Sequence, residues 1–221
     1  PNQFGMSDAG TPFTCSGALV YNTKNINDAI KAMAVNVDKP MLLGRKNLEH
    51  WVDTGQTNPW TRYLGATSHL GTVNPYSVAR LEDSIAFFSN NRDLILMNGM
   101  SPVIVSHAYA KELHTLAEVS GVETEYINSI GGRKLILMNF VGSNRSIVYD
   151  VMTTAFCEWS TWDATSGTHQ MFKGRCYTYC SDWGIHTIGH RTQPIIYTMS
   201  PDYYNDDTEV MRTQFITGIY N

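Results

Sequence analysis

The chain has 221 residues, a formal net charge of −4 and only 16% charged residues. Proteins that bind nucleic acid generally carry a basic surface, so this balance argues against a general nucleic-acid binder. No apolar run approaches the roughly 20 residues that cross a bilayer as a helix, so no membrane association is predicted.

Aromatic residues make up 11% of the chain, with 12 Tyr and 5 Trp, and this composition favours strands over helices. The four cysteines are too few and too scattered to frame a secreted domain, so free thiols are expected. They are Cys15, Cys157, Cys176 and Cys180. The chain starts with Pro and ends in FITGIYN, which resembles an interrupted strand, so we expect part of a longer chain.

The N-terminal part gives the weakest pattern. Residues 1–17 are rich in Gly, Pro, Ser and Thr and predict a loop. For residues 25–37 (NINDAIKAMAVNV), an amphipathic helix and a loop followed by a strand both stay open. We expect residues 1–38 to be a loop-rich N-terminal segment and residues 39–221 to be a β-propeller-like domain.

From residue 39 onward, short apolar runs alternate with polar turns, which is typical of β-hairpins. One predicted turn contains Glu82 and Asp83, and another is built on Asn98-Gly99, two residues that tolerate positive φ. The predicted hairpins are residues 40–52, 77–89 and 92–106.

The C-terminal half continues this pattern. Residues 131–160 predict three strands, with turns at 142–144 and 152–154. Further strands are predicted within 171–181 and 192–200, and MRTQFITGIY ends the chain.

One segment differs, because residues 106–121 are dominated by Ala, Leu, Glu and Lys. Ala110, Leu113 and Ala117 fall at helical spacing, so this segment predicts a helix that ends at Gly121.

Short strands with turns every 8–12 residues indicate a sandwich, a barrel or a propeller. The pentapeptide LILMN occurs at 94–98 and again at 135–139, a spacing close to the ~40–45 residues of a propeller blade. We therefore predict an all-β fold with one or two short helices: a β-propeller or partial propeller built of short antiparallel hairpins.

Two cysteines and two histidines lie within GRCYTYCSDWGIHTIGH: Cys176, Cys180, His186 and His190. Zinc needs four ligands within about 2.0–2.3 Å of one point. Residues 175–180 alternate like a strand, in which positions i and i+4 lie about 13 Å apart. The favoured interpretation is a strand with small buried cysteines and surface histidines, without a metal.

The other candidate metal ligands are also interpreted structurally. His107 and His114 lie seven residues apart on the predicted helix, near Glu112 and Glu118, without the His-x3-His spacing that ligands prefer. The acidic stretch lacks the EF-hand spacing and predicts a polar turn, although a weak ion stays open. Its residues are Asp202, Asn205, Asp206 and Asp207.

The sequence contains no Gly-x-Ser-x-Gly, phosphate-binding loop or dinucleotide fingerprint. No catalytic, cofactor-binding or metal-ligating residue is therefore predicted. The tryptophans are expected to pack between blades or sheets, and a sugar-binding platform is the alternative. They are Trp51, Trp60, Trp159, Trp162 and Trp183.

Residues 39–221 resemble the packaged-DNA stabilisation proteins, or tail accessory factors, of short-tailed bacteriophages. The order and spacing of several phrases carry the resemblance, since no single phrase is specific. The residues that match the family fall in four segments. Residues 39–65 contain Glu49, Trp51, Gly55, Asn58, Pro59, Trp60 and Arg62, and residues 69–89 contain Gly71 and Ser77. Residues 93–113 contain Gly99, Pro102 and Ser106, and residues 147–163 contain Tyr149, Asp150, Glu158, Trp159 and Ser160.

Two features depart from that family. The turn at Thr153-Thr154-Ala155 lacks the Gly often found there, and residues 1–38 match nothing identifiable. The chain is also shorter than family members usually are, which again predicts a partial chain.

The resemblance implies a structural virion protein of the phage tail that assembles in the bacterial host cytoplasm and has no enzymatic activity. It implies a ring, usually a hexamer, below the portal and connector, which retains packaged double-stranded DNA and conducts it at ejection without reading its sequence. Aromatic residues expected to be exposed at the subunit contact are Trp60, Tyr76, Tyr203 and Tyr204.

Two other classes of function remain as alternatives. One is a carbohydrate-binding or glycoside-cleaving propeller, which would place two carboxyl groups about 5–10 Å apart in a cleft. The other is a scaffold module within a larger polypeptide.

Overall fold

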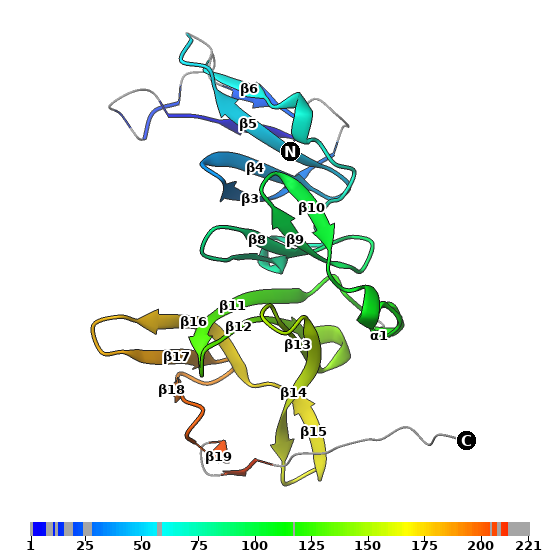
Figure 1. Cartoon of the computed structure of the whole chain (residues 1–221), viewed down its shortest axis with the longest axis vertical. Coiled ribbons are helices and arrows are strands. Elements are labelled where there is room, and N and C mark those ends of the chain that lie inside the picture. The colour runs from blue at the N-terminus through cyan, green and yellow to red at the C-terminus, as the bar shows by residue number, and fades with distance from the viewer. Residues whose placement is uncertain are drawn as a thin grey trace. The chain divides into compact units, whose positions relative to one another are not determined.

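The computed structural model builds the chain from short β-strands (Figure 1). It describes residues 2–7, 11, 13–15, 20–23, 28–56, 59–116, 118–203, 205–206 and 209–211. The chain divides into two compact units, Pro1–Tyr126 with Phe140–Ser143 and Ile127–Asn139 with Asn144–Asn221. The predicted all-β class with short helices is confirmed. None of the helices in the described ranges is long and apolar enough to span a membrane.

Two four-stranded antiparallel sheets dominate the first unit. The first sheet consists of β3 (Ile30–Asn36), β4 (Lys39–Gly44), β5 (Leu48–Asp53) and β6 (Trp60–Arg62), in that order. The second sheet has the order β10 (Ser101–Ile104), β9 (Leu94–Asn98), β8 (Ile85–Phe88) and β7 (Val78–Arg80). Since each strand lies beside the next one in the sequence, the three predicted hairpins are confirmed.

The N-terminal segment contains more strand than the composition predicted. β1 (Gln3–Gly5) pairs with β2 (Val20–Asn22), so the loop expected over residues 1–17 is wrong at β1. β3 settles the open alternative for residues 25–37 in favour of a strand, because six of its seven residues pair with β4. The first sheet thus joins residues on both sides of position 38, while the predicted domain boundary there stays a prediction.

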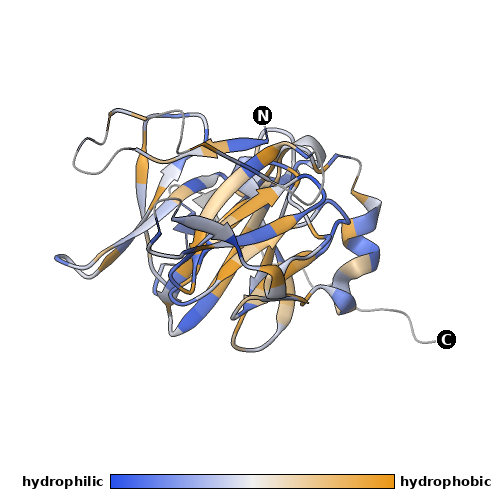
Figure 2. Ribbon diagram, turned by 90° about the horizontal axis from the view of Figure 1, so that it is seen from above, coloured by the Kyte–Doolittle hydropathy of each residue, from blue (hydrophilic) through white to orange (hydrophobic). Residues whose placement is uncertain are grey.

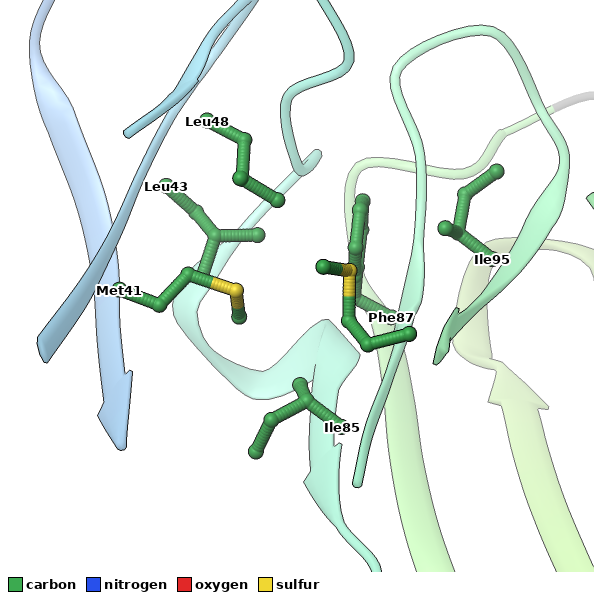
Figure 3. Close-up of a cluster of buried hydrophobic side chains, with 7 residues drawn as sticks. Met41, Leu43, Leu48, Ile85, Phe87 and Ile95 are labelled. Carbon is green, nitrogen blue, oxygen red and sulfur yellow. The ribbon is translucent and has the colours of Figure 1, made fainter. Parts of the chain in front are cut away.

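An apolar cluster fills the space between the two sheets of the first unit (Figure 3). The first sheet contributes Met41, Leu43 and Leu48, and the second sheet contributes Ile85, Phe87, Ile95 and Met97. All seven are at most 2% exposed. Full burial of one such side chain stabilises a fold by about 1.5–3 kcal/mol, so this cluster fixes the two sheets face to face.

The second unit repeats this construction. The third sheet has the order β11 (Val122–Ile130), β12 (Arg133–Phe140), β13 (Arg145–Asp150), β14 (Ala155–Asp163) and β15 (Thr168–Met171). The fourth sheet consists of β16 (Gly174–Cys180), β17 (Ile185–His190) and β18 (Ile196–Met199). Two short strands follow, β19 (Asn205–Asp206) and β20 (Glu209–Val210). The three strands predicted within 131–160 are confirmed, and β17 occupies a stretch to which no strand was assigned.

A second cluster holds the sheets of this unit together. Ile127, Leu137 and Val148 of the third sheet are fully buried, and Tyr177 and Met199 of the fourth sheet pack against them. Figure 2 shows the hydrophobic residues concentrated along the strands. Both units therefore rest on sheets that bury one face against the next sheet.

The predicted helix is much shorter than expected. In place of one helix over 106–121, the structure has a short 3-10 helix, η4 (His107–Tyr109), followed by a short α-helix, α1 (Ala110–Thr115). The Arg92 guanidinium donates hydrogen bonds to the carbonyl oxygens of His114 and Leu116, at 2.9 and 2.6 Å. These hydrogen bonds satisfy carbonyl groups that lack an intrahelical partner at the end of α1, so Arg92 stabilises that end. The helix ends at Thr115, and the stop predicted at Gly121 is wrong. Ala117 lies outside the described residues, as do residues 212–220 of the predicted C-terminal strand.

The two LILMN pentapeptides do not occupy equivalent places. The first forms β9, the third strand of the second sheet in chain order. The second lies in β12, the second strand of the third sheet. The interpretation of this pentapeptide as a blade repeat is therefore wrong, even though both copies form central strands.

Gly71 lets two loops of the first unit approach closely. Its backbone exchanges hydrogen bonds with Asn90, which lies in the turn after β8. A Cβ at position 71 would collide with the backbone of Arg45 and Lys46. Since backbone atoms cannot move aside as a side-chain tip can, only glycine fits here.

We expect Gly71→Ala to lower the free energy of unfolding by about 1–3 kcal/mol, because the added methyl group forces the loops apart. Urea denaturation followed by tryptophan fluorescence measures this change. The matched control is Gly121→Ala, whose Cβ would meet only Val141 at 3.9 Å. Equal stability of the two variants would contradict the close-approach argument.

A buried histidine joins the two sheets of the first unit. His50 of β5 has no exposed surface, and its Nδ1 lies 3.1 Å from the carbonyl oxygen of Ala66. If Nδ1 donates there, Nε2 accepts from the Asn36 side-chain amide at 3.1 Å. The same Asn36 amide group donates to the carbonyl of Gly99 in the β9–β10 turn, at 2.8 Å. This arrangement requires a neutral imidazole.

Burial lowers the pKa of His50 below its usual value, and the nearby Lys39 ammonium lowers it further, against the opposing effect of the Ala66 hydrogen bond. Above about pH 6.5 the imidazole is neutral in both the folded and the unfolded chain. As the pH falls below that value, the unfolded chain takes up the proton first. The free energy of unfolding therefore falls with decreasing pH.

We expect His50→Gln to reduce this loss of stability between pH 7 and pH 5. Urea denaturation at a series of pH values measures it, with His114→Gln, at an exposed position, as the control. If His50→Gln retains the full pH dependence of the wild-type chain, the buried histidine is not its source.

Candidate functional site

The Cys/His stretch forms an antiparallel β-hairpin. The strand predicted for residues 175–180 is confirmed as part of β16. Tyr179 pairs with His186 and Cys180 pairs with Ile185 across β16 and β17. Paired residues share a face and consecutive residues alternate, so Cys180 and His186 point to opposite faces of the sheet. Cys176 lies in a β-bulge with φ +60°, between Arg175 and Tyr177.

The side chains of this hairpin have other partners. The Tyr177 hydroxyl lies 2.7 Å from Nδ1 of His186 and 3.0 Å from the carbonyl oxygen of Asn128. Nδ1 of His190 accepts hydrogen bonds from the backbone amides of Thr192 and Gln193. The expectation of buried cysteines is wrong, because Cys176 is exposed and Cys180 is half-buried. None of the four cysteines forms a disulfide in the described part of the chain.

The remaining candidate ligands do not converge either. His107 and His114 are exposed, and Glu118 lies beyond the end of α1. Asp206 forms an ion pair with Lys173 at 2.8 Å, and Asp202 accepts a hydrogen bond from Ser200. Asp207 lies outside the described residues. Within the described ranges, no three His, Cys, Asp or Glu side chains are placed to hold a metal ion together.

Three tryptophans pack where the sequence expected them, in the apolar clusters of the sheets. Trp51 is 2% exposed and Trp60 lies partly buried beside it. Trp159 packs against the core of the third sheet, edge-on to Phe172. Trp183, in the turn between β16 and β17, is 76% exposed. The tryptophans therefore do not form one sugar-binding platform.

The residues that carry the family resemblance support turns and sheet faces. Glu49 is 3% exposed; its carboxylate accepts from the Trp51 indole at 3.3 Å and pairs with Arg62 at 3.5 Å. The hydroxyl of the buried Ser106 donates to Asp93 and accepts from the amide of Leu94. Asn58 lies outside the described residues. These contacts indicate structural roles and not chemistry on a substrate.

Asp150 organises the turn that departs from the family pattern. Burial raises the pKa of Asp150, but hydrogen bonds from Met152 and Thr153 and the charge of Arg133 outweigh burial, so the pKa is lowered. The turn places Thr154 at φ +57°, a conformation that glycine adopts without strain. The backbone at position 154 therefore favours the glycine that this chain lacks.

We expect Thr154→Gly to raise the free energy of unfolding by about 1 kcal/mol, because it relieves the left-handed backbone strain. Thr153→Gly, one residue earlier and at negative φ, should lower it by about 0.5–1 kcal/mol. Denaturant midpoints of the two variants check the pair. A loss of stability in both variants would show that Thr154 is not strained.

The first unit contains an apolar groove of about 400 Å³ between β3 and β7. Its walls include Met33 and Val35 of β3, Val78 of β7 and Pro75 of η3 (Pro75–Ser77). Met33 is 67% exposed and Val35 is 50% exposed. Sequence analysis missed this groove, since the alternation of Met33 and Val35 with two alanines has meaning only once β3 is known to be a strand.

Comparison with known proteins adds a family. A family model described as "Bacteriophage P22 Gp10, beta-propeller" matches residues 2–204. The search of curated proteins gave no significant match. Among solved structures, the chain is similar to the computationally designed Ika4 protein, with 9% sequence identity and a TM-score of 0.41. That similarity covers 81% of this chain and 95% of that chain, and it is too weak to support any conclusion.

Proposed function

Because the chain belongs to the phage-stabilisation family of bacteriophage P22 Gp10, we propose that it acts as a ring-forming protein of the phage tail. The ring, a hexamer in this proposal, retains packaged double-stranded DNA and conducts it at ejection. The family supports the coarser statement directly: the chain is a phage structural β-propeller protein of the virion.

The single observation that best supports a load-resisting role is the face-to-face packing of antiparallel sheets through fully buried apolar clusters. Close-packed protein interiors have low compressibility, so such a stack resists deformation. A wall around packed DNA needs this stiffness and needs no catalytic group. We accordingly propose no catalytic residue and no cofactor.

The charge of the chain suits the passage of DNA. A net charge of −4 gives weak repulsion of phosphates, which lets a duplex slide without binding and without sequence readout. The partners in this proposal are further copies of the chain, the portal or connector, and other tail proteins, assembled in the host cytoplasm.

The proposed subunit contact uses exposed aromatic residues. Tyr76 is 65% exposed and Tyr203 is 56% exposed, as the sequence predicted. The expectation that Trp60 is exposed is wrong, because it packs partly buried against Trp51, and Tyr204 lies outside the described residues. Tyrosine is enriched at interfaces because it contributes a large apolar area and a hydroxyl group.

Native mass spectrometry and negative-stain imaging test the ring. We expect the wild-type chain to form a closed ring with an axial hole wide enough for a duplex. The double variant Tyr76→Ser and Tyr203→Ser should dissociate at least about tenfold more readily, since truncation of a central interface tyrosine costs about 1–2 kcal/mol.

Trp183→Ser is the matched control, since it removes an equally exposed aromatic residue from a hairpin turn outside the proposed contact. It should assemble like the wild-type chain. A wild-type chain that stays monomeric at high concentration would end the ring proposal. An undisturbed ring in the double tyrosine variant would remove only the proposed contact.

A further inference from the structure

The groove between β3 and β7 is bordered by two open sheet edges. β3 is the outermost strand of the first sheet and β7 is the outermost strand of the second, so in the described part of the chain each has one neighbour only. Four consecutive residues, 32–35, line the groove, which means that it follows the backbone edge of β3 and not just one face. An open edge presents unpaired amide and carbonyl groups to an incoming strand.

The side chains around this edge favour an extended apolar guest. Met33 and Val35 alternate with Ala32 and Ala34 along β3, and Val78 faces them from β7. A strand added to such an edge would place every second side chain against this apolar lining. β3 has seven residues, which sets the length of the guest at about seven or eight residues.

The charge of Arg80 indicates a second property of the bound segment. Arg80 is the single charged residue among those that line the groove, and it is exposed. In the described part of the chain, no residue accepts a hydrogen bond from the Arg80 guanidinium or forms an ion pair with it. A guanidinium pairs best with a carboxylate, by two parallel hydrogen bonds.

We propose that the β3–β7 groove binds an extended apolar peptide segment of another protein, which adds a strand to the edge of β3 and places a carboxylate against Arg80. Main-chain hydrogen bonds to β3 supply affinity, the apolar pockets select alternate side chains, and Arg80 fixes the register. This inference goes beyond the proposed ring and does not depend on it.

The probe is a set of fluorescein-labelled octapeptides that alternate valine and threonine and carry one aspartate at each position in turn. Fluorescence anisotropy with the full chain measures binding. We expect one aspartate position to bind best, and Arg80→Glu to weaken that peptide by about tenfold or more. The same variant should bind the matching lysine peptide better than the aspartate peptide.

Two controls isolate the geometry. Lys111→Glu makes the same charge reversal on exposed α1, away from the groove, and should leave binding unchanged. Methylation of the peptide's backbone amides on its β3-facing edge should abolish binding, because it removes the donors of the added strand without removing a side chain.

Three outcomes would overturn the proposal: binding that ignores Arg80→Glu, binding that survives backbone methylation, or no binding by any peptide of the set. A groove filled by a second copy would also overturn it, seen as a wild-type dimer that Arg80→Glu dissociates. Since Arg80→Glu leaves Tyr76 and Tyr203 intact, ring assembly in this variant separates a failure of the groove from a failure of the ring.

Discussion

The two sheets of the first unit each give one apolar face to the other, and the arrangement of that unit follows from this contact. With the first and second sheets fixed face to face by the cluster around Met41, Leu43 and Phe87, their first strands come to lie near each other. The loops that carry Gly71 and Asn90 then meet with no room for a side chain. In the second unit, the third and fourth sheets likewise pack together through a buried apolar cluster, which contains Ile127, Leu137 and Val148.

Burial on this scale makes an unpaired polar group costly, at about 1–3 kcal/mol. His50 lies within hydrogen-bonding distance of the Ala66 carbonyl oxygen, and the Asn36 amide group donates to the carbonyl of Gly99 in the β9–β10 turn. The side-chain oxygen of Asn36 is buried there without a hydrogen-bond partner. On the opposite face of the first sheet, the buried Glu49 carboxylate forms an ion pair with Arg62 and accepts a hydrogen bond from the Trp51 indole. Such contacts fix one packing arrangement, as the proposed role around packed DNA would require.

The exposed parts of the molecule are where partners would act. Apolar side chains that the sheets cannot cover gather along β3, and aromatic residues gather on loops such as that of Tyr76. A sheet stack always leaves edges, and an uncovered edge tends to pair with another strand. In the proposed assembly, partners would cover these surfaces.

The sequence by itself determined the fold class, most hairpins and the strand nature of residues 175–180, because alternation of apolar residues and turn chemistry are local properties. Its composition also sufficed to place Trp51 and Trp159 inside. It failed where contacts outside the segment decide: Arg92 stabilises an early end of α1 at Thr115, and pairing with β4 makes β3 a strand. The tertiary structure alone decided that the LILMN copies are not equivalent, that Cys180 and His186 face apart, and that β3 and β7 border one groove. Each of these depends on strand register or on packing between sheets, which the pattern within a single segment does not contain.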